Sequence, residues 1–288
     1  MTCDIIPGTG FVRLIADDID PSVLDLSCGL GWSVEQLQIG FPAVRPVVRN
    51  RALDDGAFDE TTFVGQRAVT LTVRFDGRQF MQGFIDQIMP FVSPRRRPQM
   101  QYQLSGSGDV RTLSLRGVDA PVVIDGPSYQ AVSVSWVSTE SYARGSEEKC
   151  VTLETSSEEG RTYDLTFDRV YGSSSFVAST SVNVVGNVPS PWVVTIFADV
   201  TDPAFRINGV EVSFTGVSLA GGATLVIDAE ARTMLLDGDP TQSVFGDSNF
   251  FDWTWDDLYL RPGENLIEYL GSPLDASSMT LCYYDRYL

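Results

Sequence analysis

The sequence has 288 residues, of which 43% are hydrophobic and 20% are charged. A chain of this size buries roughly three quarters of its unfolded surface, which is enough for one large or two ordinary domains. No apolar run approaches the roughly 20 residues of a membrane-spanning helix, and the start, Met1-Thr2-Cys3-Asp4, lacks the features of a secretory signal. We therefore expect a soluble protein that is made in a cytoplasm and has no membrane span.

The absence of histidine excludes most hydrolase chemistry. Ser/His/Asp and Cys/His nucleophilic sites, His-ligated zinc and the usual proton shuttle at neutral pH all need an imidazole. A glycosidase needs only two carboxylates, so the acidic stretch from Asp252 to Asp257 leaves that reaction open. Carboxylates this abundant are more typical of a solvated acidic surface. We predict a protein that is not an enzyme, with no catalytic residues, no cofactor and no metal.

Cysteines and charge give two further expectations. The four cysteines are dispersed and form no CxxC pair, so we expect free, buried thiols at Cys3, Cys28, Cys150 and Cys282. Acidic residues outnumber basic ones by 38 to 20, which gives a formal net charge of −18, and Lys149 is the only lysine. The preference for arginine has two explanations that stay open: a GC-rich genome, or ordered interfaces that use the planar guanidinium.

Apolar residues with a period of two predict strands in the first half. Every second residue from Val69 to Phe75 is apolar and the residues between are polar, which is typical of a strand with one buried face, here Arg67–Phe75. Shorter alternations between turn-forming clusters lie at 100–104, 113–115 and 132–136. The first half is therefore predicted to be mostly β.

One segment of the first half has helical periodicity instead. Between Gly77 and Pro90 the apolar residues recur at helical spacing, at Phe80, Met81, Phe84, Ile85, Ile88 and Met89. We predict a helix over Gln79–Met89 that packs this stripe on the sheet. Pro90 is expected to end it, because proline disfavours a helical residue before it.

A polar, glycine-containing stretch, Ser141–Gly160, separates the two halves. We place the domain boundary there, with domains at 1–145 and 146–288. The second half contains short predicted strands at Trp192–Phe197, Phe205–Ile207, Val210–Phe214, Leu225–Ile227, Arg232–Leu236, Leu266–Leu270 and Met279–Tyr284. Strands this short and this numerous predict a β-sandwich, in which Asp228–Ala231 joins two of them as a hairpin turn.

Two charged motifs have plain structural explanations. Asp237-Gly238-Asp239 lacks the ligand spacing and the closing glutamate of an EF-hand, so a hairpin turn explains it better than a calcium site. Arg95–Arg97 is the only basic run in an acidic chain and would make a poor nucleic-acid site. We interpret it as a loop that pairs with acidic neighbours, and we expect no sequence-specific binding of nucleic acid.

The aromatic run Phe250–Trp255 is the candidate sugar site. An exposed ring flanked by carboxylates suits the face of a pyranose, so Trp253 and Trp255 are candidate contacts for a glycan. Packing of these rings in the core is the alternative that we favour.

The order of several short motifs resembles a known family. Arg45–Asn50, then Asp55-Gly56, then Gly65–Arg67 and the strand to Phe75 are similar to the N-terminal belt domain of phage distal tail (Dit) proteins, and the predicted helix follows in the expected place. The second half is similar to the C-terminal domain of siphovirus-type tail proteins. Its matching motifs are Asn187-Val188 with Pro191, the segment at Pro203, Leu225–Asp228, Arg232-Thr233, Pro262–Ile267 and Tyr284–Leu288. Together the matches span residues 45–288.

The resemblance implies a structural virion protein at the tail tip, made in the host cytoplasm. Typical members form a ring of six copies that joins the tail tube protein to the tip or baseplate proteins, gathers the tape-measure protein and tail-associated proteins, and lets DNA pass through its lumen. The implied fold is mainly β and has two domains: an N-terminal β-sandwich-like belt domain with one helix, and a galectin-like C-terminal β-sandwich. The alternative function is a tail adhesin module that binds host glycans, although a galectin-type sugar site relies on a histidine motif that this chain lacks.

Acidic residues beside the belt strand suggest a role for the negative charge. If Asp54, Asp55, Asp59 and Glu60 face the lumen of a ring, they repel DNA phosphates within a screening length of about 8 Å. The equally weighted alternative is that they lie on the outer surface and keep the protein soluble.

Overall fold

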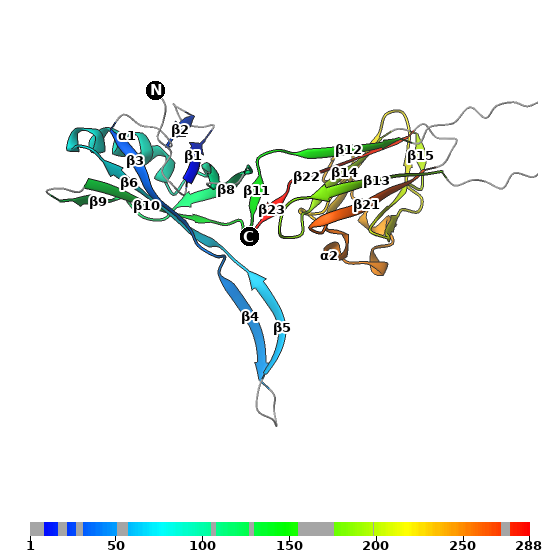
Figure 1. Cartoon of the computed structure of the whole chain (residues 1–288). Helices are drawn as coiled ribbons and strands as arrows, with labels where there is room; N and C mark the ends of the chain where they lie inside the picture. The colour runs from blue at the N-terminus through cyan, green and yellow to red at the C-terminus, as the bar shows by residue number, and fades with distance from the viewer. Residues whose placement is uncertain are drawn as a thin grey trace, which may run out of the picture. The chain divides into compact units, whose positions relative to one another are not determined.

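The computed structural model describes residues 9–16, 22–26, 31–50, 57–104, 108–126, 130–154, 176–197, 199–271 and 277–288. The chain is mainly β, as predicted, and divides into two compact units (Figure 1). The first unit contains Met1–Ser146 and Tyr287–Leu288, and the second contains Glu147–Arg286. The division therefore falls within the polar stretch that separates the two halves of the sequence, and the last two residues lie in the first unit.

The first unit is built on an antiparallel sheet. Its main path runs β2-β1-β7-β8-β10-β6-β3, and β9 and β11 pair with β10 and β8. The strands are β1 Thr9–Ile15, β2 Val23–Asp25, β3 Trp32–Ile39, β6 Arg67–Phe75, β7 Gln99–Leu104, β8 Val110–Gly117, β9 Val122–Asp125, β10 Gln130–Ser138 and β11 Ala143–Gly145. The short strand β23, Arg286–Tyr287, ends in this unit.

The two halves of this sheet share one core. Val12 and Leu14 of β1 belong to the same buried cluster as Val69 and Leu71 of β6, near the other end of the path. Within β6, alternate side chains from Arg67 to Phe75 are buried and those between are partly or fully exposed, because successive side chains of a strand point to opposite faces. The unit is therefore sandwich-like, as predicted.

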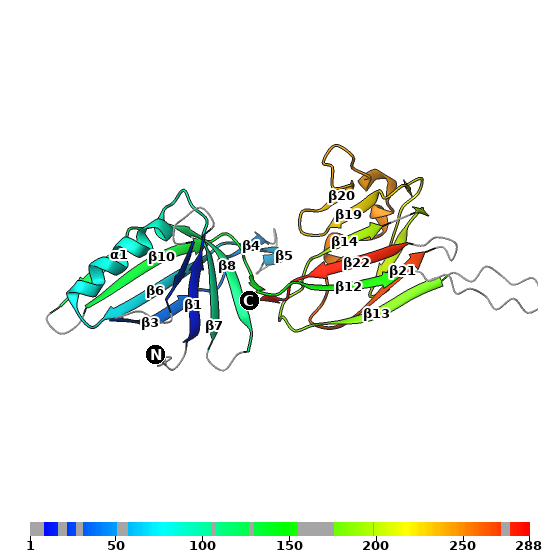
Figure 2. The ribbon, with the colours of Figure 1, turned by 90° about the horizontal axis from the view of Figure 1, so that it is seen from above.

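The helix α1, Arg78–Val92, packs on β6, β8 and β10 (Figure 2). The predicted end at Pro90 is wrong, because Pro90 lies inside the last turn, where its missing N–H removes one hydrogen bond. Burial of Phe91 and Val92 in the core offsets that loss. The predicted buried stripe is also wrong at its last residue. Met89 is 47% exposed, and Phe91 is the residue that is buried in the last turn.

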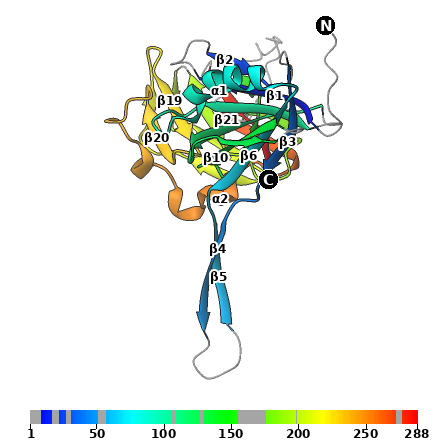
Figure 3. The same cartoon turned by 90° about the vertical axis from the view of Figure 1, so that its left-hand side faces the viewer.

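A hairpin that the sequence analysis did not predict connects β3 to β6. Its strands are β4, Val44–Asn50, and β5, Ala57–Val64, which pair antiparallel with a register shift between Val47 and Val48. The hairpin projects from the sheet of the first unit (Figures 1 and 3).

The second unit is a β-sandwich, also as predicted. One sheet has the order β12-β22-β14-β19-β20 and the other β13-β21-β16-β17, and side chains of both form one core cluster. The elements are β12 Lys149–Glu154, β13 Phe176–Val184, β14 Trp192–Phe197, β15 Val200–Thr201, β16 Ala204–Ile207, β17 Val210–Ser213, β18 Ser218–Leu219, β19 Thr224–Asp228, β20 Thr233–Leu236, η1 Phe245–Asp247, η2 Phe250–Asp252, α2 Trp255–Leu258, β21 Gly263–Gly271 and β22 Ser278–Tyr283. The predicted hairpin turn between β19 and β20 is confirmed, and Asp228 Oδ1 accepts the N–H groups of Glu230 and Ala231 at 2.8 Å each.

The expectation of free, buried thiols is wrong for two cysteines. Cys150 of β12 and Cys282 of β22 stand opposite each other in register, with Cα atoms 4.1 Å apart, and form a disulfide. Cys150 is exposed and Cys282 is half-buried. Cys3 and Cys28 lie outside the described residues.

Candidate functional site

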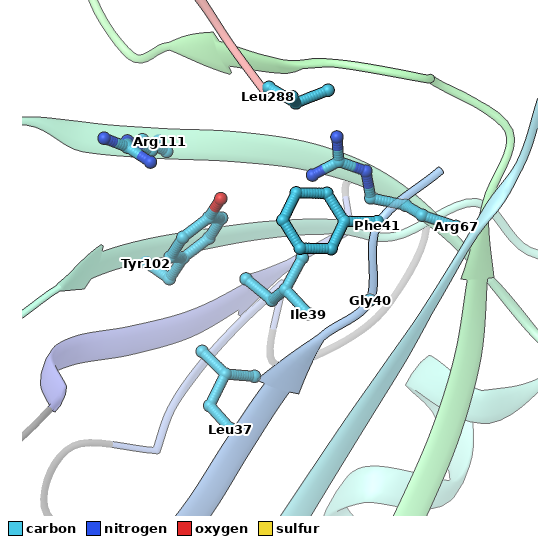
Figure 4. A pocket seen from close by; sticks show the side chains of 8 residues that line it. All are labelled: Leu37, Ile39, Gly40, Phe41, Arg67, Tyr102, Arg111 and Leu288. Atoms are coloured by element: carbon cyan, nitrogen blue, oxygen red, sulfur yellow. The ribbon is translucent and has the colours of Figure 1, made fainter. Parts of the chain in front are cut away.

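A cavity of about 260 Å³ in the first unit collects polar and apolar side chains from separate strands (Figure 4). Its lining consists of Leu37, Ile39, Gly40, Phe41, Arg67, Tyr102, Arg111 and Leu288. We call it the arginine pocket. Pockets that enclose drug-sized ligands occupy roughly 300 to 1,000 Å³, so this one suits a single side chain better than a cofactor.

Arg67 is the buried cation of the arginine pocket. It is the first residue of β6 and is only 3% exposed, because it lies on the same strand face as Val69 and Leu71. One guanidinium NH2 group donates to the backbone oxygen of Ser141, but Nε has no hydrogen-bond partner among the described residues. Burial lowers the pKa of Arg67 below its ordinary value, although an arginine stays charged at neutral pH.

Tyr102 and Arg111 form the other polar wall. They stand opposite each other in the pairing of β7 with β8, and their side chains hydrogen-bond. Burial raises the pKa of the Tyr102 phenol, against the opposing effect of the charges of Arg111 and Arg67. The Arg111 Cζ lies 4.1 Å from the centroid of the Tyr287 ring, and its buried Nε also has no partner among the described residues. The pocket therefore holds two guanidinium groups with N–H donors to spare.

The first unit also carries an exposed apolar strand. All four residues of β9 are exposed, including Val122, Val123 and Ile124, and so is Val118 in the preceding loop. We call these four apolar residues the β9 surface. A groove of about 410 Å³ lies beside Val118 and is lined by Met89, Val92, Ser93, Pro94, Gly117, Val118, Asp119, Ala120 and Pro121. Exposed apolar side chains that form a contiguous patch mark interaction sites in soluble proteins.

One solved structure shares this architecture over nearly its whole length. The chain is similar to the SPP1 Dit protein, described as a paradigm of the hub adsorption apparatus in phages that infect Gram-positive bacteria. The two chains are 12% identical with a TM-score of 0.61, and the likeness covers 96% of this chain and 99% of the SPP1 chain. The chain has the Dit fold.

Two further likenesses are weaker. A chain of the phage P2 baseplate in its activated conformation with Ca is 12% identical, with a TM-score of 0.40 and coverage of 94% of this chain and 97% of that one. A β-porphyranase of glycoside hydrolase family 86 from Bacteroides plebeius is 10% identical, has a TM-score of 0.23, and is covered over only 40% of its length. Neither likeness supports an argument about function. No protein-family model and no curated protein matches the sequence.

Within the Dit fold, the aromatic run of the second unit lies mostly against the core. Trp253 is 7% exposed and donates its Nε1–H to Asn249 Oδ1 at 3.0 Å. It therefore packs in the core, which is the alternative to a sugar contact that we favoured from the sequence. Trp255 is half-buried, and its ring lies edge-on to that of Trp253 at 5.4 Å. The ring that does face solvent is Phe251, which is 88% exposed.

The charged motifs serve turns and caps. Asp237 and Gly238 have positive φ angles of 51° and 67° in a turn, and Asp239 Oδ1 accepts the N–H of Thr241 at 2.9 Å. Asp257 accepts hydrogen bonds from Thr254 at the start of α2, which hold the pKa of the Asp257 carboxyl below its ordinary value. Within the described residues, no group of three His, Cys, Asp or Glu side chains is placed to hold a metal, and no helix is long and apolar enough to cross a membrane.

The basic run and the candidate lumen-facing acids belong to the first unit. Arg95–Arg97 lie in the loop between α1 and β7, and the pairing of this loop with acidic neighbours stays a prediction. Asp54 and Asp55 lie outside the described residues. Asp59 and Glu60 belong to β5, but their side chains are not described.

The sequence analysis missed the arginine pocket, although one signal for it was present. Arg67 is two residues before Val69 in a strand where every second side chain points to the same face. The sequence therefore places a charged residue on the predicted buried face, with Val69, Leu71 and Val73. Its proximity to Tyr102 and Arg111 depends on how distant strands pack.

Proposed function

We propose that this chain is a structural component of a phage tail tip and acts as a distal tail hub. The Dit fold over nearly the whole of both compared chains carries this proposal, because the likeness includes both units. The family resemblance adds the finer expectation of a ring of six copies. This ring joins the tail tube protein to the tip or baseplate proteins, meets the tape-measure protein and tail-associated proteins, and passes DNA through its lumen.

A ring needs a specific contact between copies, and the β9 surface suits that contact. Specific interfaces bury more than about 1,000 Å² and have an apolar centre. The β9 surface adjoins the groove at Met89, because Val118 belongs to both, and the two together are the candidate face. We assign this face to the contact between neighbouring copies.

The passage of DNA belongs to the same proposal. Acidic groups that face the lumen, with Asp54, Asp55, Asp59 and Glu60 as the candidates from the sequence, would repel phosphates over about 8 Å at physiological salt. Purified protein should then show no binding to DNA at low salt, where binding through any basic site is strongest.

The assembly mass of the purified protein tests the ring. Six copies of the 31.6 kDa chain give a particle of about 190 kDa, to be sought by mass photometry or native mass spectrometry at rising concentration. Val123→Lys should abolish that particle, because it places a charge in an apolar contact. Phe251→Lys, the matched control on an exposed apolar residue of the second unit, should leave it intact. A wild-type protein that stays monomeric at every concentration contradicts self-assembly, and a Val123→Lys ring contradicts the assigned face.

The alternative function, a host-glycan adhesin, has one favourable observation. The centroid of the exposed Phe251 ring lies 4.0 Å from that of the Phe250 ring, so two neighbouring aromatic rings are available to a sugar. A glycan array probed with the full chain and with Phe251→Ala decides this alternative. Selective binding that the substitution removes supports it, and the absence of selective binding rules it out.

A further inference from the structure

We propose that Asn208 is a site of spontaneous deamidation, which the folded second unit holds closed and which opens when the end of β16 separates from β21. This proposal does not rest on the proposed function. Asn208 and Gly209 form the turn between β16 and β17, and they are the only Asn-Gly pair in the sequence. Glycine has no Cβ, so the backbone nitrogen of Gly209 is easily reached by the side chain before it. Asn208 is exposed, so water has access to it.

The reaction needs only the chain itself and water. The backbone nitrogen of Gly209 attacks Cγ of the Asn208 side chain and forms a C–N bond with it. The proton of that nitrogen passes to the departing group, and Nδ2 of Asn208 leaves as ammonia. Water then opens the cyclic imide at either carbonyl carbon and leaves aspartate or isoaspartate in the chain. No electron is transferred, and the product carries a negative charge that asparagine lacks.

The fold holds both polar atoms of the Asn208 amide. Oδ1 accepts the backbone N–H of Leu266 on β21 at 3.0 Å, and Nδ2 donates to Asn265 Oδ1 at 2.8 Å. The backbone N–H of Asn208 also donates to the Leu266 carbonyl at 2.9 Å, so Asn208 extends the pairing of β16 with β21 beyond Ile207. Because Nδ2 is the nitrogen that leaves, the reaction cannot be completed while the bond to Asn265 persists. Deamidation therefore requires a local opening at this end of β16.

Asn265 cannot adapt to the product. It is fully buried, and both of its polar side-chain atoms have other partners. Oδ1 also accepts the Arg261 N–H at 2.8 Å, and Nδ2 donates to the carbonyls of Arg261 and Gly263 at 2.7 and 2.9 Å. A carboxylate at position 208 has no proton to donate at neutral pH, so two oxygens would face each other where a hydrogen bond now lies. Deamidation is therefore expected to destabilise the closed turn.

Mass spectrometry of the full chain tests the site. Wild-type protein is incubated at mildly alkaline pH, both folded and unfolded in guanidinium chloride, and the peptide that contains Asn208 is followed for its gain in mass and for isoaspartate. We expect the folded chain to be modified at least about tenfold more slowly than the unfolded chain, the factor that corresponds to hydrogen bonds of ordinary strength. Equal rates in the two states, or no modification of the unfolded chain, would overturn the proposal.

A variant of Asn265 separates its hold on Asn208 from general loosening of the second unit. Asn265→Ala removes the partner of Asn208 Nδ2 and should speed modification of the folded protein by about tenfold. Thr254→Ala is the control, because it loses a side-chain hydrogen bond at the start of α2 and should leave the rate unchanged. A folded Asn265→Ala protein that is modified no faster than the wild type would overturn the proposal.

A second pair of variants tests the consequence of the modification and decides, together with the wild-type rates, if Asn265→Ala does not fold. Asn208→Asp imitates one product and should lower the equilibrium constant for folding by about tenfold, as the loss of one hydrogen bond does. Asn183→Asp adds the same charge at an exposed position of β13 and should have a smaller effect. An Asn208→Asp protein as stable as the Asn183→Asp protein would contradict the role assigned to Asn265.

Discussion

The indole Nε1–H of Trp136 donates a hydrogen bond to the carbonyl oxygen of Phe91 at 3.1 Å. Phe91 lies in the last turn of α1, where backbone carbonyls have no partner within the helix. Trp136 is fully buried on β10, so this bond ties the end of the helix to the sheet. It accompanies the burial of Phe91 in stabilising a helical turn that contains Pro90.

Removal of this donor should destabilise the first unit. Trp136→Phe leaves the buried Phe91 carbonyl without its partner and leaves a small void, so we expect the free energy of unfolding to fall by about 1 to 3 kcal/mol or more. Urea denaturation followed by circular dichroism measures the change. Trp32→Phe is the matched control, because the buried Trp32 Nε1 has no partner among the described residues and the substitution loses no hydrogen bond there. A cost for Trp32→Phe equal to that for Trp136→Phe would contradict the assigned role of the bond.

Gly117 should not tolerate a side chain. A Cβ at this position would lie 1.7 Å from the backbone oxygen of Val92, so the end of α1 and β8 would have to separate. We expect Gly117→Ala to destabilise the first unit by several kcal/mol, as overpacking of a rigid site does. Gly83→Ala, in the exposed face of α1 with no atom within 4 Å of the new Cβ, should stabilise it by up to about 1 kcal/mol. Thermal unfolding of both variants checks the contrast, which an unchanged Gly117→Ala protein would contradict.

The disulfide should stabilise the second unit. It joins residues 132 positions apart and connects the edge strand β12 to β22. Replacing Cys150 and Cys282 together by serine should lower the free energy of unfolding by about 2 to 4 kcal/mol. The loss should appear in hydrogen exchange of the second unit and not of the first. Equal protection of β12 in the variant and in the wild type would contradict this account.

The pair of Lys149 and Asp285 predicts a dependence on pH. Lys149 Nζ lies 2.5 Å from Asp285 Oδ2, and Asp285 Oδ1 accepts the Val185 N–H at 2.9 Å. Burial lowers the pKa of Lys149, but the hydrogen bond and the charge of Asp285 raise it by more, so the pKa lies above its ordinary value of 10.5. A raised pKa stabilises the fold fully below the unfolded-state pKa, and this contribution is lost as the pH rises through the folded-state pKa.

The stability difference between wild type and Lys149→Met should therefore stay constant from neutral pH to about pH 9 and shrink above the ordinary lysine pKa. Urea denaturation at about pH 8 and about pH 11 measures it. Asp285→Ala should cost about 1 to 3 kcal/mol at neutral pH, because it also leaves the Val185 N–H without an acceptor. A difference for Lys149→Met that grows with alkaline pH would contradict the assignment.

Sequence reasoning succeeded where one strand face is buried and the other is wet. The strand Arg67–Phe75 was predicted with its observed bounds because its apolar residues alternate, whereas β9 was missed because all its side chains are exposed and no alternation exists. Pairings between distant strands determine the rest. The disulfide depends on the register of β12 with β22, and the arginine pocket depends on four strands, β3, β6, β7 and β8, that meet in space. Neither the disulfide nor the arginine pocket produces a pattern in the local sequence. The continuation of α1 through Pro90 likewise depends on tertiary packing, that of Phe91.

The most direct test of the tail-tip assignment is a cryo-EM reconstruction of tails from virions assembled with this chain. The account predicts density at the distal end of the tail into which both units fit, repeated around the tail axis, with the β9 surface covered by the neighbouring copy. Density for this chain in the capsid, at the neck or along the tail shaft, with none at the tip, would contradict it.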